Sequence, residues 1–394
     1  AESTPATHSY EVKVKDEEPA GIAIDATNFP DANFRNYLLS QDYGKDGVLT
    51  EREIQKVTDI NVDNKKIGSL KGIEYFTALT KLYCNFNRLT ALDVSKNTAL
   101  KILQCYSNQL TSLDVSKNTA LTSLWCEDNQ LTALDVSKNT SLTWLYCYSN
   151  QLTALDVSKN TALKSLYCYS NRLTALDVSK NTALTILYCY SNQLTALVVS
   201  KNTALEILDC SSNQLTALVV SKNAALRELS FYGNMIKGTA MDALIASLPK
   251  ITTSWQYRFC LHDTSVKNEG NVCTKAQVAA VKAKGWFPCY YDANTRQYVE
   301  YEGSGEEQPV TITAKSYTRE YGDANPTFEY TATGGTLSGK PAITCEATVK
   351  SPVGTYPIVV KQGSVTNGDV TYVGGKLTIT KAPLTAKALD VTVE

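Results

Sequence analysis

Residues 121–162 read LTSLWCEDNQLTALDVSKNTSLTWLYCYSNQLTALDVSKNTA, which is two consecutive copies of one 21-residue unit. The unit recurs along residues 57–234, and its clearest marker is a cysteine in each regular copy. These cysteines are Cys84, Cys105, Cys126, Cys147, Cys168, Cys189 and Cys210. A fixed period of this length is typical of a solenoid, in which every copy forms one turn of a stack.

Each copy follows the pattern L-x-x-L-x-C-x-x-N-x-L, as in Leu79, Leu82, Cys84, Asn87 and Leu89. Because side chains alternate along a strand, Leu82 and Cys84 are expected to point inward. The asparagine falls where the chain leaves the strand, where a buried amide can bind the backbone groups of the turn. The second half, LTALDVSKNTA, is too short for a full helix and predicts an extended convex side.

This unit is a leucine-rich repeat, and with cysteine at the third inward position it resembles the cysteine-ladder internalins, which are bacterial surface proteins. The resemblance is most specific over residues 57–234. It implies a mainly β fold with short helices, built as a right-handed leucine-rich-repeat solenoid. It also implies a secreted or cell-surface protein that adheres to a protein or glycan on a host or microbial surface.

A single repeat is not expected to be stable alone. Its six inward apolar groups contribute on the order of 10–20 kcal/mol by burial, and ordering its backbone costs at least as much, at roughly 1–2 kcal/mol per residue. Both ends of the stack therefore need caps. We assign residues 28–56, with two short helical patterns around a glycine-containing loop, to an EF-hand-like N-terminal cap. Residues 57–248 form the solenoid, and residues 249–302 complete a C-terminal cap.

The remaining segments differ in composition from the repeats. Residues 1–27 read as a flexible leader, with a polar start that suggests a mature N-terminus after export. Residues 303–309, GSGEEQP, read as a linker. Residues 310–381 predict a β-sandwich-like module, because alternating strand patterns are separated by turn signals. This module resembles the MBG domains of bacterial surface proteins. Residues 384–394 echo residues 312–322, so residues 382–394 predict the start of a second module.

The repeated cysteines are expected to be buried free thiols. Neighbouring strands lie about 4.8 Å apart, whereas a disulfide needs Cβ atoms about 3.8 Å apart, and one column of ligands gives no tetrahedral metal site. Cys260, Cys273 and Cys289 lie in the C-terminal cap, near His262. A disulfide between two of them is one interpretation, and a zinc site with His262 is another, although the close cysteine pairs of usual zinc modules are missing.

Aromatic residues flank the cysteines and are expected to point outward, on the concave side. Large exposed aromatic patches mark interaction sites, and tyrosine and tryptophan are enriched in binding hot spots. The alternative is that ring packing between neighbouring rungs stabilises the sheet. The predicted ligand-binding residues are Tyr83, Tyr106, Trp125, Trp144, Tyr146, Tyr148, Tyr167, Tyr169, Tyr188 and Tyr190.

The loop in the N-terminal cap resembles a calcium-binding loop. Asp42, Asp46, Thr50 and Glu53 fall at positions of an EF-hand where side chains bind the ion, and Val48 would supply its carbonyl group. The third position, however, is a glycine. The alternative needs no ion, because Thr50 and Glu53 have the spacing of a capping box for the following helix. A structural calcium ion is thus one of two interpretations.

Composition argues against several functional classes. The net charge of -1 gives no electrostatic reason to expect a nucleic-acid partner, and no apolar stretch is long enough to predict a membrane span. There are two histidines, and neither has a nucleophile motif nearby. We therefore expect a monomeric binding protein that is not an enzyme, with a structural spacer or envelope scaffold as the alternative.

Overall fold

The computed structural model describes residues 21–252, 257–267, 269–304, 309–335, 337–365 and 370–384. The chain divides into two compact units, and each is described by itself. The first comprises Ala1–Leu215 and Val220–Gly233, and the second comprises Thr216–Val219 and Asn234–Glu394.

The N-terminal cap begins earlier than the sequence predicts. The leader was expected to extend to residue 27, but β1 (Ile22–Ala23) pairs with β2 (Val48–Leu49), so residues 21–27 belong to the cap. Residues 1–20 lie outside the described residues. The two predicted helices are confirmed as α1 (Ala32–Leu39) and α2 (Glu51–Ile54). The Asp31 carboxylate caps α1 by accepting hydrogen bonds from the N–H groups of Asn33 and Phe34.

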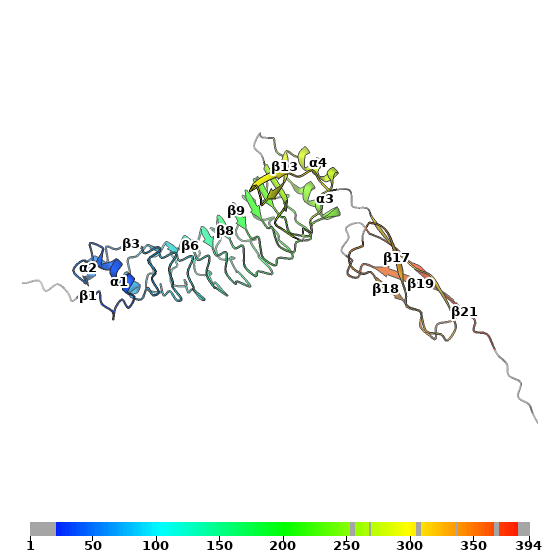
Figure 1. Cartoon of the computed structure of the whole chain (residues 1–394), viewed down its shortest axis with the longest axis horizontal. Coiled ribbons are helices and arrows are strands. Elements are labelled where there is room, and N and C mark those ends of the chain that lie inside the picture. The colour runs from blue at the N-terminus through cyan, green and yellow to red at the C-terminus, as the bar shows by residue number, and fades with distance from the viewer. Residues whose placement is uncertain are drawn as a thin grey trace, which may run out of the picture. The chain divides into compact units, whose positions relative to one another are not determined.

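The repeats form a ladder of short parallel strands, and a 3₁₀ turn, η1 (Ile73–Tyr75), precedes the regular copies. The strands pair one to one, so that Leu82 lies beside Leu103 and Leu103 beside Leu124. Figure 1 shows these strands along the inner side of a curved stack. They are β3 (Asp59–Asn61), β4 (Lys81–Tyr83), β5 (Ile102–Gln104), β6 (Ser123–Trp125), β7 (Trp144–Tyr146), β8 (Ser165–Tyr167), β9 (Ile186–Tyr188), β10 (Ile207–Asp209) and β11 (Glu228–Ser230).

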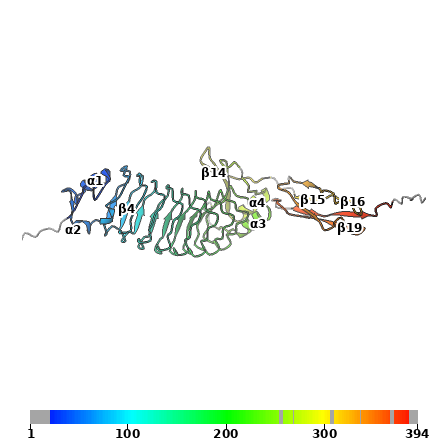
Figure 2. The same ribbon diagram turned by 90° about the horizontal axis from the view of Figure 1, so that it is seen from below.

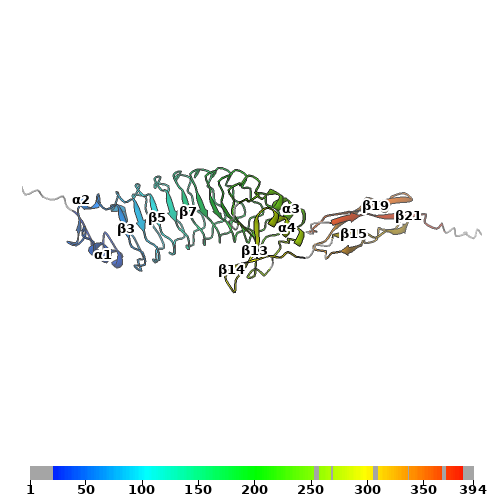
Figure 3. The same ribbon diagram turned by 90° about the horizontal axis from the view of Figure 1, so that it is seen from above.

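The predicted solenoid is therefore confirmed, together with its extended outer side. The segment LTALDVSKNTA forms no helix in the described copies. Seen from below in Figure 2, the rungs follow one another in parallel. Seen from above in Figure 3, the strands β3, β5 and β7 lie in order along the stack. The concave side of the repeats is the strand side.

The core of the ladder consists of leucine, valine and cysteine. Leu82, Leu103 and Leu124 are fully buried, and all seven repeated cysteines are buried free thiols, as predicted. Burial raises the pKa of Cys168 to about 12 and raises the pKa of Cys147 well above its usual range. A thiol that stays protonated at physiological pH reacts poorly with oxidants and metals. The cysteines act as small apolar side chains.

The predicted asparagine column joins consecutive rungs through side-chain hydrogen bonds. The Nδ2 group of Asn150 donates to the carbonyl oxygens of Cys126 at 3.1 Å and of Cys147 and Tyr148 at 3.2 Å. Its Oδ1 atom accepts from the N–H group of Leu131 at 2.9 Å. One side chain thus binds backbone groups of two consecutive rungs, and a buried backbone group left without a partner costs about 1–3 kcal/mol.

A second asparagine column, not predicted from the sequence, lies in the outer half of each repeat. Asn160 is fully buried, and its Nδ2 group donates to the carbonyl oxygens of Val136 and Asn139 at 2.9 Å. The same bonds recur at every repeat, because the outer segment has no sheet to satisfy its backbone. The members of this column are Asn97, Asn118, Asn139, Asn160, Asn181, Asn202 and Asn223.

The second unit begins with a cap of helices and strands that starts before residue 249, the boundary predicted from the sequence. Its first helix is α3 (Gly238–Ser247), which buries Met241, Leu244 and Ile245. The other elements are β12 (Tyr257–Asp263), α4 (Lys275–Ala283), β13 (Trp286–Asp292) and β14 (Gln297–Glu300). Ser304 still donates to the carbonyl of Cys273 at 2.9 Å, so the cap extends into the predicted linker. Residues 305–308 of that linker lie outside the described residues.

The C-terminal module is a sandwich of two small sheets, as predicted. One sheet has the strand order β17-β15-β20 and the other β16-β21-β19-β18. Its core joins both sheets through Ile312, Ile358 and Leu377, which are fully buried. The strands are β15 (Val310–Ala314), β16 (Tyr317–Glu320), β17 (Tyr330–Gly334), β18 (Ala342–Cys345), β19 (Gly354–Lys361), β20 (Val370–Val373) and β21 (Gly375–Thr380). Residues 385–394, most of the predicted second module, lie outside the described residues.

Within the part of the chain that the structure describes, no helix has both the length and the apolar character needed to cross a bilayer.

The asparagine column predicts a large effect of a single substitution. Asn150→Ala removes three donated hydrogen bonds and one accepted bond from buried backbone groups, so we expect the free energy of unfolding to fall by about 2–4 kcal/mol. Urea denaturation followed by circular dichroism measures this change. Lys159→Ala, an exposed substitution in the same repeat, serves as the control and should stay within about 0.5 kcal/mol. A loss below 1 kcal/mol for Asn150→Ala would contradict the assigned role.

Candidate functional site

The predicted aromatic residues lie on the strand side of the repeats, and neighbouring members are in contact. In the column before the cysteines, the strand register places Trp125 beside Tyr146, then Tyr167 and Tyr188. We call the ten residues predicted from the sequence the aromatic surface: Tyr83, Tyr106, Trp125, Trp144, Tyr146, Tyr148, Tyr167, Tyr169, Tyr188 and Tyr190.

The column after the cysteines contains a stack of three parallel rings. The ring centroids of Tyr148 and Tyr169 are 4.2 Å apart, and those of Tyr169 and Tyr190 are 4.1 Å apart, with planes 10° and 11° from parallel. In the neighbouring column, Tyr146 and Tyr167 meet edge to face at 4.4 Å. The ring packing that the alternative interpretation expected is thus present.

The rings are consequently less exposed than strand alternation alone suggests. Nine residues of the aromatic surface are half-buried, and from Tyr106 to Tyr190 neighbouring rings cover part of one another. Trp144 is the exception, with 44% of its surface exposed. Its neighbours in the strand register are Ser123 and Ser165, whose short side chains leave the indole uncovered.

Tyr83 is the member that the structure separates from the others. Gln104 lies between Tyr83 and Trp125 in the strand register, so the aromatic column is interrupted there. The central contact region therefore runs from Tyr106 to Tyr190. Burial raises the pKa of Tyr146 and of Tyr190 to about 12, so these phenols are neutral hydrogen-bond donors at physiological pH.

The structure adds one residue to this site, Glu127. It occupies the position after the cysteine that holds tyrosine in the adjacent copies, between Tyr106 and Tyr148. Only 3% of its surface is exposed, and its Oε2 atom is buried with no hydrogen-bond partner. Burial raises the pKa of its carboxyl to about 7. The signal was visible in the sequence as CED in place of CYS, but its burial depends on the flanking rings.

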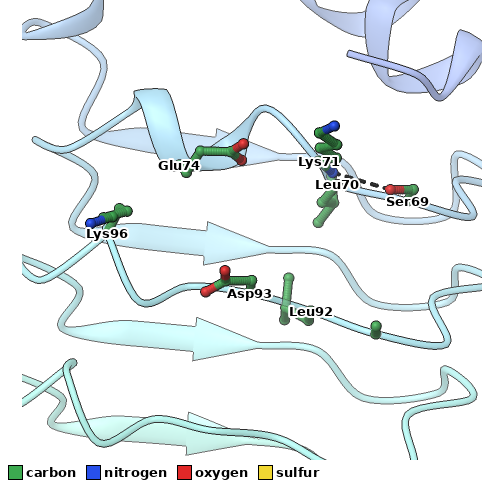
Figure 4. Close-up of a pocket in the computed structure, with 8 residues that line it drawn as sticks. Ser69, Leu70, Lys71, Glu74, Leu92, Asp93 and Lys96 are labelled. Carbon is green, nitrogen blue, oxygen red and sulfur yellow. Dashed lines mark hydrogen bonds between the residues drawn. The ribbon is translucent and has the colours of Figure 1, made fainter. Parts of the chain in front are cut away.

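A hollow on another part of the repeats is shown in Figure 4. It has a volume of about 390 Å³ and is lined by residues of the outer segments of the first repeats, within 69–74 and 91–96, apart from the aromatic surface. Figure 4 shows the carboxylates of Glu74 and Asp93 and the ammonium of Lys96 around it. Among the described buried polar atoms without a partner, none belongs to a residue that lines this hollow. Its charges of both signs indicate no particular ligand.

The loop in the N-terminal cap contains the predicted capping box. The N–H and O–H groups of Thr50 donate to Glu53 Oε2 at 2.9 and 2.7 Å. Asp42 forms an ion pair with Lys45, and Asp46 accepts from the N–H group of Val48 at 3.1 Å. Within the described ranges, no group of three or more histidine, cysteine or acidic side chains is arranged to hold a metal ion. To bind calcium, Glu53 would exchange its hydrogen bonds with Thr50 for the ion.

The three cysteines of the C-terminal cap are buried free thiols. Cys260 and Cys289 are register partners on the parallel strands β12 and β13, and Cys273 precedes α4. His262 Nδ1 lies 3.6 Å from a carboxylate oxygen of Glu269. In this structure no disulfide joins two of these three cysteines, although such a bond was one interpretation of the sequence.

The buried carboxyl of Glu127 predicts a pH-dependent stability difference. The pKa of this carboxyl is about 7 in the folded chain and lies near its ordinary value of 4.5 in the unfolded chain. The folded state therefore holds more protons between these values, and the free energy of unfolding falls as the pH rises through this range. We expect Glu127→Gln to be more stable than the parent by about 1–3 kcal/mol at pH 8, with the difference disappearing below pH 4.5.

Urea denaturation at pH 4, 6 and 8 measures this difference. Asp156→Asn is the control. Hydrogen bonds from Ser158 lower the pKa of this exposed aspartate, so its replacement should either lower the free energy of unfolding at pH 8 or leave it unchanged. Equal stability of Glu127→Gln and the parent at all three pH values would show that the carboxylate is not desolvated.

Calcium binding at Asp42, Asp46, Val48, Thr50 and Glu53 stays a prediction with a direct test. If the loop binds calcium, 1 mM CaCl₂ should raise the melting temperature of the parent, because a ligand that binds only the folded state stabilises it. Glu53→Gln should remove this shift. Glu51→Gln, on the same helix but outside the predicted ligand set, should retain it. If calcium does not shift the melting temperature of the parent, the role of Glu53 is limited to the capping box.

Comparison with known proteins agrees with this architecture. Residues 310–378 match the family described as MBG domain (YGX type), and they contain YGD at 321–323. A stretch of 71 residues, 18% of this chain, is 42% identical to Internalin J of Listeria monocytogenes serotype 4b (strain F2365). That match spans 8% of the relative's length.

Two solved structures from the same genus are similar. One is described as the functional domain of InlJ from Listeria monocytogenes, which includes a cysteine ladder; the match covers 92% of this chain and 100% of that one, at 23% identity and a TM-score of 0.44. Internalin C2 from Listeria monocytogenes strain 4b F2365 matches with a TM-score of 0.50 and 18% identity, over 54% of this chain and 97% of that one, which supports the fold. The chain is therefore a leucine-rich-repeat solenoid with a ladder of buried cysteines, similar over 71 residues to Internalin J, and its residues 310–378 match the MBG domain family.

Proposed function

We propose that this chain is a secreted or cell-surface adhesion protein, and that its aromatic surface binds a protein or glycan ligand. The proposal is for binding rather than catalysis, with the second unit holding the repeats away from the cell envelope. The internalin-like character of the repeats supports a role in binding. The ligand itself is not identified by the relatives, since the matched stretch of Internalin J is a small part of that protein.

The observation that carries this proposal is the one-sided distribution of the rings. The strand side of the regular repeats carries the ten residues of the aromatic surface, whereas the outer segment repeats LTALDVSKNTA without aromatic residues. Trp144 is 44% exposed at the centre of the strand side, where burial in a complex would stabilise it most. Stabilisation of the sheet accounts for stacked rings, but it does not account for an exposed indole.

The alternative is a structural spacer without a specific ligand, and the ring packing favours it. Each aromatic pair contributes about 0.5–1.5 kcal/mol beyond the area that it buries. A spacer would therefore lose stability, and nothing else, when the rings are removed.

Trp144→Ala separates the two functions, because Trp144 is the most exposed ring of the aromatic surface and has serines, not rings, as its neighbours in the strand register. If the aromatic surface binds a ligand, this substitution should weaken binding to a glycan array or to immobilised cell-surface proteins at least tenfold, while the variant stays folded at the assay temperature. The quadruple alanine variant at Tyr146, Tyr148, Tyr167 and Tyr169 should abolish binding and also lower the melting temperature.

Val198→Ala is the matched control, since Val198 is a large apolar residue that is 68% exposed outside the aromatic surface. It should bind as the parent does. Equal binding by the parent, Trp144→Ala and the quadruple variant would favour the spacer.

A further inference from the structure

Glu127 is placed where it costs stability, in the middle of the aromatic surface. Its carboxylate is buried, and its Oε2 atom has no partner among the described residues. Removing a carboxylate from water without a compensating charge or hydrogen bond is unfavourable. The repeat offers an obvious replacement, because the same position holds tyrosine in the copies on either side. A buried group that weakens the fold is a candidate for function.

The rungs on both sides place aromatic rings next to this carboxylate. The N–H group of Ser107 donates to the carbonyl of Glu127 at 3.0 Å, and the N–H group of Asp128 donates to the carbonyl of Tyr148 at 3.2 Å. Tyr106 and Tyr148 are therefore the rung neighbours of Glu127. Burial is the main cause that raises the pKa of Tyr148, and the charge of Glu127 is the second. The second effect reflects how close the two side chains are.

Trp125 adds a further element to the same place. It points to the same side of β6 as Glu127, since the two residues are two positions apart. Its ring centroid lies 4.7 Å from that of Tyr146. The indole Nε1 atom of Trp125 is, like Glu127 Oε2, buried without a partner. An acceptor and a donor without partners thus lie among four aromatic rings.

The charge of Glu127 is not balanced on this side of the repeats. In the strands β5 to β9 and the residues that flank their cysteines, Glu127 is the one charged residue at an outward position. In the described rungs that precede β5, Lys81 also points outward. Its Nζ atom lies 3.0 Å from Oδ1 of Asp59, with which it forms an ion pair. Beyond β9, the outward charged residues of the repeats are Asp209 and Glu228, both acidic.

We propose that the part of the aromatic surface around Glu127 binds the lysine or arginine side chain of a protein partner. This inference rests on the proposed binding function and names the class of its ligand. The faces of the rings of Tyr106, Trp125, Tyr146 and Tyr148 attract a cation. The carboxylate beneath them adds an attraction that water screens poorly, because the group is buried. A neutral glycan would gain nothing from this charge, and an anionic glycan would be repelled.

The proposal predicts a specific dependence on charge at one position. Fluorescently labelled full-chain protein is applied at pH 8 to a microarray of random-sequence peptides and to a glycan array. We expect the peptides that the parent retains to be enriched in lysine and arginine. Glu127→Gln, which keeps the shape and removes the charge, should reduce binding to those peptides at least tenfold.

Two controls separate this effect from general charge and from misfolding. Asp156→Asn removes one carboxylate from the outer side and should bind within twofold of the parent. Glu127→Gln is expected to be the more stable protein at pH 8, so unfolding does not account for lost binding, and its melting curve verifies this. In the best peptide, exchange of the lysine or arginine for glutamine should weaken binding to the parent but not to Glu127→Gln, as a double-mutant cycle requires.

The possible outcomes distinguish this inference from the proposed function. If peptides bind without enrichment of basic residues, or if Glu127→Gln retains the enrichment, the inference is wrong and the binding function stands. Binding to glycans alone, lost in Trp144→Ala, leads to the same conclusion. If the parent binds neither array, both the inference and the proposed function are wrong.

Discussion

The structure depends on the hydrogen bonds by which buried asparagine side chains close every turn of the coil. A coil of this kind has short strands, and much of its backbone lies inside without a strand partner. In each repeat the amide of one asparagine binds three carbonyl groups of two consecutive rungs and accepts one N–H group. A second asparagine donates to two carbonyl groups in the outer segment, while its own Oδ1 atom is buried without a partner. Leucine burial drives the stacking, and these amides provide hydrogen bonds to buried backbone carbonyl groups of consecutive rungs.

The one-to-one register of the rungs determines both the core and the outer surface of the repeats. Because every rung repeats after the same number of residues, equivalent side chains lie beside one another along the whole ladder. Inside, this places cysteine on cysteine, and burial makes the thiols unreactive. Outside, it places tyrosine on tyrosine at stacking distance. A surface made of such columns is rigid before any ligand arrives, and rigid aromatic groups lose little entropy on binding.

Departures from the repeat carry most of the functional information. A ladder of identical copies would present the same chemistry at every rung, and a ligand could bind anywhere along it. Trp144 and Glu127 break this uniformity in adjacent rungs, one by exposing an indole and the other by burying a carboxylate. Together they mark one place on the aromatic surface. In the described part of the MBG module the buried charged residue is Arg319, whose guanidinium has hydrogen-bond partners in Asn325, Glu320 and Thr348.

The sequence by itself determined the coil, its period, the inward and outward columns and the β-module, because these follow from spacing and alternation within short segments. The exact limits of the caps did not follow: Ile22 and Ala23 join the N-terminal cap only through pairing with Val48 and Leu49, which are distant along the chain. The second asparagine column was present in every copy, but its role depends on carbonyl groups of the preceding rung. Only the tertiary structure decided that the outward rings cover one another and enclose Glu127. Burial and the pKa of a side chain depend on what neighbouring rungs place beside it, and alternation along one strand carries no information about that.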